Sequence, residues 1–184
     1  MAADAGFVEM RLGKVVGVAT AEDHPSFCVV LDAVSDERRL AITIGETEAF
    51  NLSASLTGMV FRRPMSPQFA AGLLHALGGR VRQVRIDRLV PVAGGTAYGA
   101  TVEVEATPGV SGVSGASGAS GVSLVDARPS DALNLVAVVP APILVAEEVL
   151  ADAESRLAGD SPEAIGLRHA LEDGQMAVWQ RRQG

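Results

Sequence analysis

Apolar and polar residues alternate in the first part of the chain in the way typical of β-strands. A loosely alternating segment, 7–18, is followed by the apolar runs 27–34 and 39–45, which flank the turn-like sequence SDER. Alternation places successive side chains on opposite faces of a sheet, and Ser and Asp favour tight turns. The pattern therefore predicts three strands, the last two paired as a β-hairpin.

Two helices are predicted next. Apolar residues recur three to four positions apart over 46–57, between two glycines, with acidic residues in the first turn, where they favour the helix dipole. A second helix over 66–77 begins with Ser-Pro, a typical helix start, and ends at a Gly-Gly pair. We expect both helices to pack on the sheet.

The central part of the chain predicts a long hairpin. Strand patterns over 80–92 and 94–106 meet at Gly94-Gly95. Strict alternation along the first of them places Arg82 and Val84 on one face and Arg85 on the other. The Gly/Ser-rich residues 108–121 are expected to form a flexible loop, with an interdomain linker as the competing interpretation.

The rest of the chain predicts a returning strand and then helices. The strand-like run 122–126 suits a hairpin arm, and helical patterns cover 130–139, 143–158 and the region after Ser161-Pro162. Strands and helices do not alternate strictly, so the fold class is α+β: a mostly antiparallel or mixed sheet with helices packed on it. We expect a single domain over 1–158 with a C-terminal helical extension over 159–184.

Charge and composition limit the function classes. The chain has 184 residues, 48% of them apolar, and a formal net charge of −7, which excludes a global basic field for binding nucleic acid. Arginines nevertheless gather in one region: Arg62, Arg63, Arg80, Arg82, Arg85 and Arg88. A bias toward Arg codons explains this as well as a preference for phosphate does.

The same sequence indicates a cytoplasmic protein. No secretory signal is visible at the N-terminus, and the longest apolar run, 135–146, is too short to span a bilayer. The single cysteine, Cys28, stands in an apolar run and is expected to be a small buried residue and a poor nucleophile. His24, His75 and His169 complete no zinc pattern.

One polar segment stands out between the returning strand and the following helix. VDARPSDAL, residues 125–133, places two aspartates, an arginine and a serine around a proline. Together with RRLAITIGETEAF (38–50), FRRPMSP (61–67) and VRQVRIDRL (81–89), this segment resembles the bifunctional nuclease (BFN) domain family. The resemblance covers about 6–152, and DARPSDA is its most specific part.

The resemblance implies a small α+β domain of bacterial type, with DNase and RNase activity as in some members. One departure concerns the segment after Arg63-Pro64, where the family usually continues with Thr, His and an acidic residue. Here the sequence is Met65-Ser66-Pro67-Gln68, so the imidazole and the carboxylate are both replaced. If relatives use those groups for metal binding or proton transfer, this chain lacks them.

Phosphodiester cleavage needs charge stabilisation, an activated water and usually a divalent cation held by carboxylates. The candidate catalytic residues are Asp126, Arg128, Asp131 and Glu46, and the candidate substrate-binding residues are Arg63 and Ser130. Asp126 and Asp131 are the candidate ligands of Mg²⁺ or Mn²⁺, and the arginines are candidate phosphate clamps. Glu46 and Glu48 are two residues apart, so on a helix they point in different directions.

Each candidate also has a purely structural interpretation. Asp131 suits the first turn of a helix, where an acid satisfies free amides. Asp126 can cap the turn or pair with Arg128, and Arg63 can pair with Glu46. An Arg–carboxylate lattice that holds the hairpin to the helix would explain an intact DARPSDA without any catalysis.

Two functions from different classes follow. The first is a metal-assisted nuclease of weak activity that acts on DNA or RNA, without membrane association and with a homodimer or other homo-oligomer as the expected assembly. The second is a non-catalytic regulatory or ligand-binding module that uses the same Arg/Asp pocket. The lost imidazole and the acidic net charge favour the second function, whereas DARPSDA is compatible with both.

Overall fold

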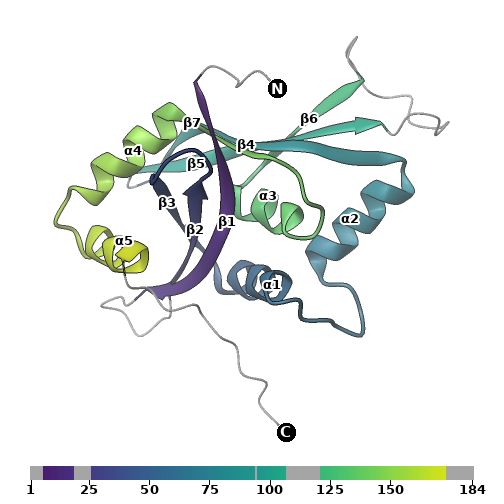
Figure 1. Cartoon of the computed structure of the whole chain (residues 1–184), viewed down its shortest axis with the longest axis horizontal. Helices are drawn as coiled ribbons and strands as arrows, with labels where there is room; N and C mark the ends of the chain where they lie inside the picture. Colours follow the sequence, from purple (N-terminus) through teal and green to yellow (C-terminus); the bar gives the residue numbers. More distant parts are fainter. Residues whose placement is uncertain (1–5, 19–25, 94, 107–120, 173–184) are drawn as a thin grey trace, which may run out of the picture.

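The computed structural model describes residues 6–18, 26–93, 95–106 and 121–172. Its centre is one seven-stranded mixed sheet with the strand order β3-β2-β1-β7-β4-β5-β6 (Figure 1). The strands are β1 (Phe7–Val18), β2 (Ser26–Ala33), β3 (Arg39–Ile44), β4 (Gly79–Val92), β5 (Gly95–Ala106), β6 (Val122–Ala127) and β7 (Ile143–Ala146). The helices are α1 (Glu46–Leu56), α2 (Ser66–Ala76), α3 (Pro129–Val136), α4 (Glu147–Leu157) and α5 (Pro162–Glu172). The predicted α+β class and the single domain are confirmed.

The N-terminal strands form the predicted hairpin. β1 pairs with β2 and β2 with β3, all antiparallel, and Leu31 lies opposite Leu40. Both of these leucine side chains are fully buried. The register therefore places the apolar positions of the two strands on the same face, toward the core.

The second predicted hairpin is also present. β4 and β5 are antiparallel, and β6 returns along β5 as the outer strand of the sheet. The predicted returning arm over 122–126 is therefore confirmed. The predicted loop over 108–121 lies outside the described residues except for Gly121.

One prediction about β4 is wrong. The pairing of β4 with β5 shifts at two β-bulges, one between Val81 and Gln83 and one between Ile86 and Arg88. An extra residue at a bulge interrupts the alternation of side chains. Arg82 and Arg85 consequently lie on the same face, where both form ion pairs with Glu103.

A second prediction is wrong at β7. Residues 143–146 were expected to begin a helix, but they form a strand that is antiparallel to β1 and parallel to β4. Val145 is fully buried in the middle of the sheet, beside Ile86 and Val8. A four-residue apolar run that leads directly into a helix is ambiguous by periodicity alone. The strand makes the sheet mixed and joins its two antiparallel halves.

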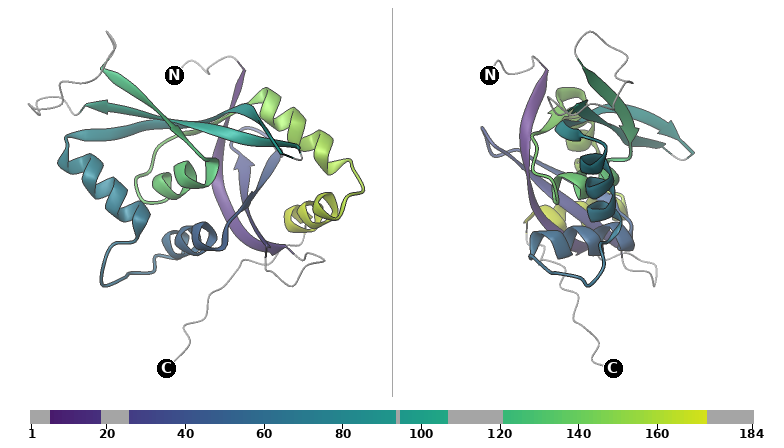
Figure 2. Two further views of the ribbon diagram at one scale, coloured as in Figure 1. Left: turned by 180° about the vertical axis from the view of Figure 1, so that it is seen from behind. Right: turned by 90° about the vertical axis from the view of Figure 1, so that its right-hand side faces the viewer.

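The helices cover the sheet from both sides. Buried side chains of α1, α3 and α4 form one core cluster with buried side chains of all strands except β6. The residues of this cluster are mostly Val, Leu, Ile and Ala. On the opposite side of β1, β2 and β3, α5 packs Leu167 and Ala170 against Val16, Cys28 and Val30. In the view of Figure 1, α1, α2 and α3 appear to the right of β1 and α4 and α5 to its left, and the view from behind in Figure 2 reverses these positions. No described helix is both long and apolar enough to cross a membrane.

Candidate functional site

The DARPSDA segment forms the junction between β6 and α3. β6 ends at Ala127, Arg128 is the N-cap residue in an extended conformation, and Pro129 is the first residue of α3. A proline restricts the residue before it to extended backbone and suits the first position of a helix. The sequence thus fixes the direction in which the Arg128 side chain leaves the backbone.

Arg128 is held by two carboxylates. Its Nε donates to Oδ2 of Asp131 at 2.8 Å, and its Nη2 donates to Oδ1 of Asp131 at 3.0 Å and to Oε1 of Glu48 at 2.9 Å. The hydrogen bonds to Asp131 and then to Glu48 raise the pKa of the guanidinium above its usual value, so it stays cationic. Nη1 donates to none of the described residues, and the Arg128 side chain is 66% exposed. The result is an oriented cation with an open donor.

Gly45 explains why Glu48 can reach this position. Gly45 is the N-cap of α1, and a Cβ built on it would overlap Oε2 of Glu48. The carboxylate therefore folds back over the start of its own helix, as glutamates at the third helical position commonly do. The spacing of glycine and glutamate in ITIGETEA positions the acid that binds Arg128 from DARPSDA.

A buried amide links the same two helices. Nδ2 of Asn134 donates to the backbone oxygens of Ser130 at 2.9 Å and of Glu48 at 3.2 Å, and Asn134 is only 4% exposed. Asn134 was not among the site residues predicted from the sequence. The sequence feature that could have identified Asn134 is its position as a polar residue in the otherwise apolar run ALNLVAVV (132–139). This residue lies on the face of α3 that turns toward α1.

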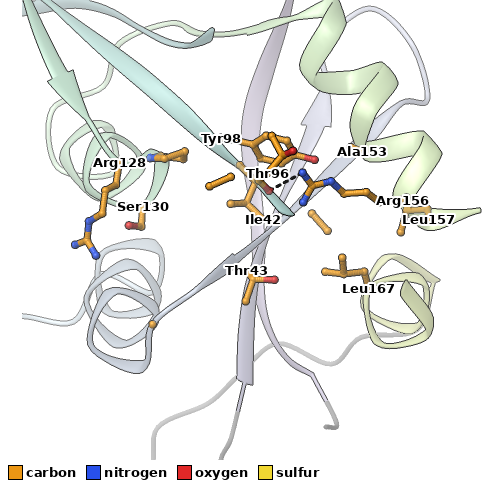
Figure 3. Close-up of a pocket in the computed structure, with 14 residues that line it drawn as sticks. Ile42, Thr43, Thr96, Tyr98, Arg128, Ser130, Ala153, Arg156, Leu157 and Leu167 are labelled. Atoms are coloured by element: carbon orange, nitrogen blue, oxygen red, sulfur yellow. Dashed lines mark hydrogen bonds between the residues drawn. The ribbon is translucent and has the colours of Figure 1, made fainter. Parts of the chain in front are cut away.

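Arg128 lies between two cavities. The first has a volume of about 360 Å³ and lies between the start of α3, β3, β5 and the helices α4 and α5 (Figure 3). On its far side, Arg156 donates to the backbone oxygen of Thr96 at 2.6 Å and stacks on Tyr98, whose hydroxyl donates to Asp152. The guanidinium of Arg128 points away from Arg156, toward α1. These contacts hold the Tyr98 ring in the wall of the cavity.

The second cavity has a volume of about 510 Å³ and lies among α1, α2, α3, β5 and β6. Arg128, Asp131 and Glu48 contribute to its lining, together with mostly apolar side chains. Arg128 thus lines both cavities, whereas its partners Glu48 and Asp131 line only the second; these three residues are called the Arg128 cluster below.

The structure brings some of the predicted site residues together and separates others. Arg128 and Asp131 are in direct contact, and half-buried Ser130 lines the first cavity beside them. Asp126 is 86% exposed and pairs with Arg88, not with Arg128. Glu46 and Arg63 are exposed and form no ion pair with any described residue. The carboxylate that reaches Arg128 from α1 is Glu48.

The predicted metal ligands, Asp126 and Asp131, bind different arginines. Among the described residues there is no group of three or more His, Cys, Asp or Glu side chains that could hold a metal ion. Glu48 and Asp131 supply oxygen donors of the kind that Mg²⁺ and Mn²⁺ prefer. Such an ion would need water or substrate oxygens for its remaining positions.

Comparisons with known proteins give a family match and similar proteins. The sequence model of the bifunctional nuclease domain matches residues 29–158, more than two thirds of the chain and including both segments that meet at Arg128. Two proteins of Mycobacterium tuberculosis, from strains CDC 1551 and H37Rv, are each 28% identical over 150 residues. The match covers 82% of this chain and 80% of each relative, and both relatives are described as uncharacterized.

Proposed function

Because the chain belongs to the bifunctional nuclease domain family, we propose that it hydrolyses phosphodiester bonds in DNA or RNA at the Arg128 cluster. The observation that carries the proposal is the orientation of Arg128 by Glu48 and Asp131, which leaves Nη1 without an acceptor among the described residues on a side chain that is 66% exposed. A planar, permanently charged guanidinium is well suited to phosphate oxygens. We expect a weak enzyme, because a net charge of −7 does not attract nucleic acid over long distances.

In the proposed reaction, Arg128 binds a nonbridging oxygen of the phosphodiester and stabilises the negative charge that develops there. The oxygen of a water molecule attacks phosphorus, and the bond between phosphorus and the leaving oxygen breaks. Asp131 accepts the proton of the attacking water, and the leaving oxygen takes a proton from solvent. We assign the base to Asp131 because its side chain is 52% exposed, compared with 21% for Glu48.

A divalent cation is part of the proposal as a component that binds together with the substrate. Mg²⁺ is commonly held by one or two carboxylates, water and phosphate oxygens. Glu48 and Asp131 are the carboxylates that would hold it, and the ion would neutralise charge on the phosphate. Asp126 is not assigned to this cluster, since it pairs with Arg88 of β4.

The test is cleavage of end-labelled single-stranded DNA and RNA with Mg²⁺, Mn²⁺ or EDTA. We expect Asp131→Asn to lower the rate by roughly 100-fold, the effect typical of removing a general base. Asp126→Asn, which changes an acid of the same segment outside the cluster, is expected to retain the wild-type rate. Equal losses in both variants would support the metal pair predicted from the sequence instead. Wild-type cleavage rates in both variants would show that a contaminating nuclease, and not this protein, cleaves the substrate.

A further inference from the structure

We propose that the outer face of α2 binds the same face of a second copy of this chain, with the two helices antiparallel about a twofold axis near Leu73. In Figure 1 and in the view from behind in Figure 2, α2 lies at the opposite edge of the molecule from α4 and α5. The outer face of α2 consists of five exposed apolar or small residues: Phe69, Gly72, Leu73, Ala76 and Leu77. The inference does not depend on nuclease activity.

The spacing of these five residues is the pattern that normally marks the buried side of a helix. They recur three and four positions apart, which places them on one side of α2. Phe69, Leu73 and Leu77 are nevertheless 63%, 51% and 60% exposed, and nothing lies within 4 Å of a Cβ built on Gly72. A contiguous exposed apolar surface of this kind is typical of a protein–protein interface.

The rest of the molecule gives α2 little packing. Of its 11 residues only Pro67 is buried, and Ala70 and Leu74 on its inner side line the cavity of about 510 Å³. A helix of this length is only marginally stable in water unless an apolar side packs on another element. Contact with a second copy on the outer face would therefore stabilise the helix itself.

The distribution of charge favours a second copy, and an antiparallel one. α2 contains no Asp, Glu, Lys or Arg, so two identical outer faces meet without repulsion between like charges. Arg62 and Arg63, just before α2, are exposed and form no ion pair with any described residue. Cations are unfavourable at the N-terminus of a helix and favourable at its C-terminus. Antiparallel helices place these arginines beside the C-terminus of the partner's α2, whereas parallel helices would bring all four arginines together.

Sedimentation equilibrium of the full chain tests the contact. We expect a reversible dimer for the wild type and a Kd at least about 100-fold weaker for Leu73→Glu, because each dimer carries the buried charge twice at its centre. Leu124→Glu is the matched control, since Leu124 lies on β6 and is 64% exposed, and this variant should dimerise like the wild type. Gly72→Glu should also weaken the dimer. Glutamate favours a helix more than glycine does, so unfolding of α2 would not explain that loss.

Disulfide formation tests the orientation of the two helices. Ser66→Cys, at the start of α2, and Leu73→Cys, near its middle, are each made in a Cys28→Ala background, which removes the single native thiol. Antiparallel helices bring the two copies of position 73 together and hold the two copies of position 66 far apart. Oxidation should therefore link Leu73→Cys into a covalent dimer but not Ser66→Cys, whereas parallel helices would link both.

The proposal is overturned if the wild type stays monomeric at millimolar concentration, if Leu73→Glu or Gly72→Glu dimerises like the wild type, or if Leu124→Glu weakens the dimer as much as Leu73→Glu does. Disulfide links in both cysteine variants, or in neither, would contradict the antiparallel arrangement. For a monomeric wild type, cosedimentation with phospholipid vesicles would show that the outer face of α2 binds lipid instead. These outcomes do not involve cleavage and are separable from the nuclease test.

Discussion

At the scale of single residues, the candidate site depends on how a glycine and a glutamate share the start of α1. Glu48 reaches Arg128 because Gly45 leaves room for its carboxylate. The sequence correctly indicated that Glu46 and Glu48 point in different directions, but it offered no reason to choose Glu48 as the residue that reaches Arg128. That choice depends on the path of the backbone between β3 and α1, which no local pattern specifies.

Gly45→Ala tests this dependence. Gly45 has φ −69° and ψ 161°, which alanine adopts without strain, so the variant acts only through the added methyl group. We expect it to displace Glu48 from Arg128 and to lower the free energy of unfolding by up to about 1 kcal/mol, the value of an ion pair with an exposed guanidinium. The same change in a Glu48→Ala background should cost much less. Equal costs in both backgrounds, measured by urea unfolding, would show that the two residues do not interact.

Cys28 gives a residue-scale prediction about pH. Burial raises the pKa of its thiol from 9.0 to about 11, against a smaller opposite effect of Lys14. Between these pH values the unfolded chain has lost a proton that the folded chain keeps, so stability falls as the pH rises through this range. The contribution is about 2 kcal/mol at pH 11. The difference in unfolding free energy between wild type and Cys28→Ala should therefore shrink by that amount from pH 8 to pH 11, and a constant difference would contradict the burial.

At the scale of elements, periodicity was informative for long segments and failed for short or irregular ones. The hairpins and the starts of α2 and α3 follow from alternation and from proline and glycine positions. β7 could not be recognised because four apolar residues lead directly into α4. The bulges in β4 could not be recognised either, since they arise from pairing with β5 and leave no local signal.

The central position of β7 predicts a large cost for a small truncation. Val145 is fully buried between β1 and β4, so Val145→Ala removes two methyl groups from the core and should lower the free energy of unfolding by about 2 kcal/mol. Val90, at the outer end of β4, is 36% exposed, and Val90→Ala is the matched control with an expected loss below about 1 kcal/mol. Similar losses in chemical unfolding would mean that residues 143–146 are not a central strand.

At the scale of the whole molecule, the family resemblance identified the fold more completely than the site. Glu48 and Arg128 belong to different motifs of the family, are 80 residues apart in sequence and are joined by a hydrogen bond, as a shared site requires. Asp126, in contrast, does not reach Arg128, because β6 ends at Ala127 and the chain then turns into α3. Which members of one polar segment face the same cavity depends on that turn and was not accessible from residue types. The division of the chain at 158 stays a prediction.

The docking of α5 on the sheet gives a prediction for the entire fold. Leu167 is 8% exposed and packs in the cluster that contains Cys28, whereas Ile165 on the same helix is 41% exposed. Leu167→Asp should detach α5 and make the buried thiol reactive toward Ellman's reagent, while Ile165→Asp should leave it protected. A thiol that is equally protected in both variants would mean that α5 does not cover Cys28.

The role of Arg128 in catalysis is decided by the cleavage rate of one labelled single-stranded oligonucleotide at saturating enzyme, measured for wild type, Arg128→Ala and Arg63→Ala. Both variants remove one exposed arginine from the segments that resemble the family. We predict a loss of roughly 100-fold for Arg128→Ala, in the range expected for removing a transition-state donor, and a rate within about threefold of wild type for Arg63→Ala. Retained cleavage in Arg128→Ala, or an equal loss in both variants, would contradict the assignment of catalysis to the Arg128 cluster.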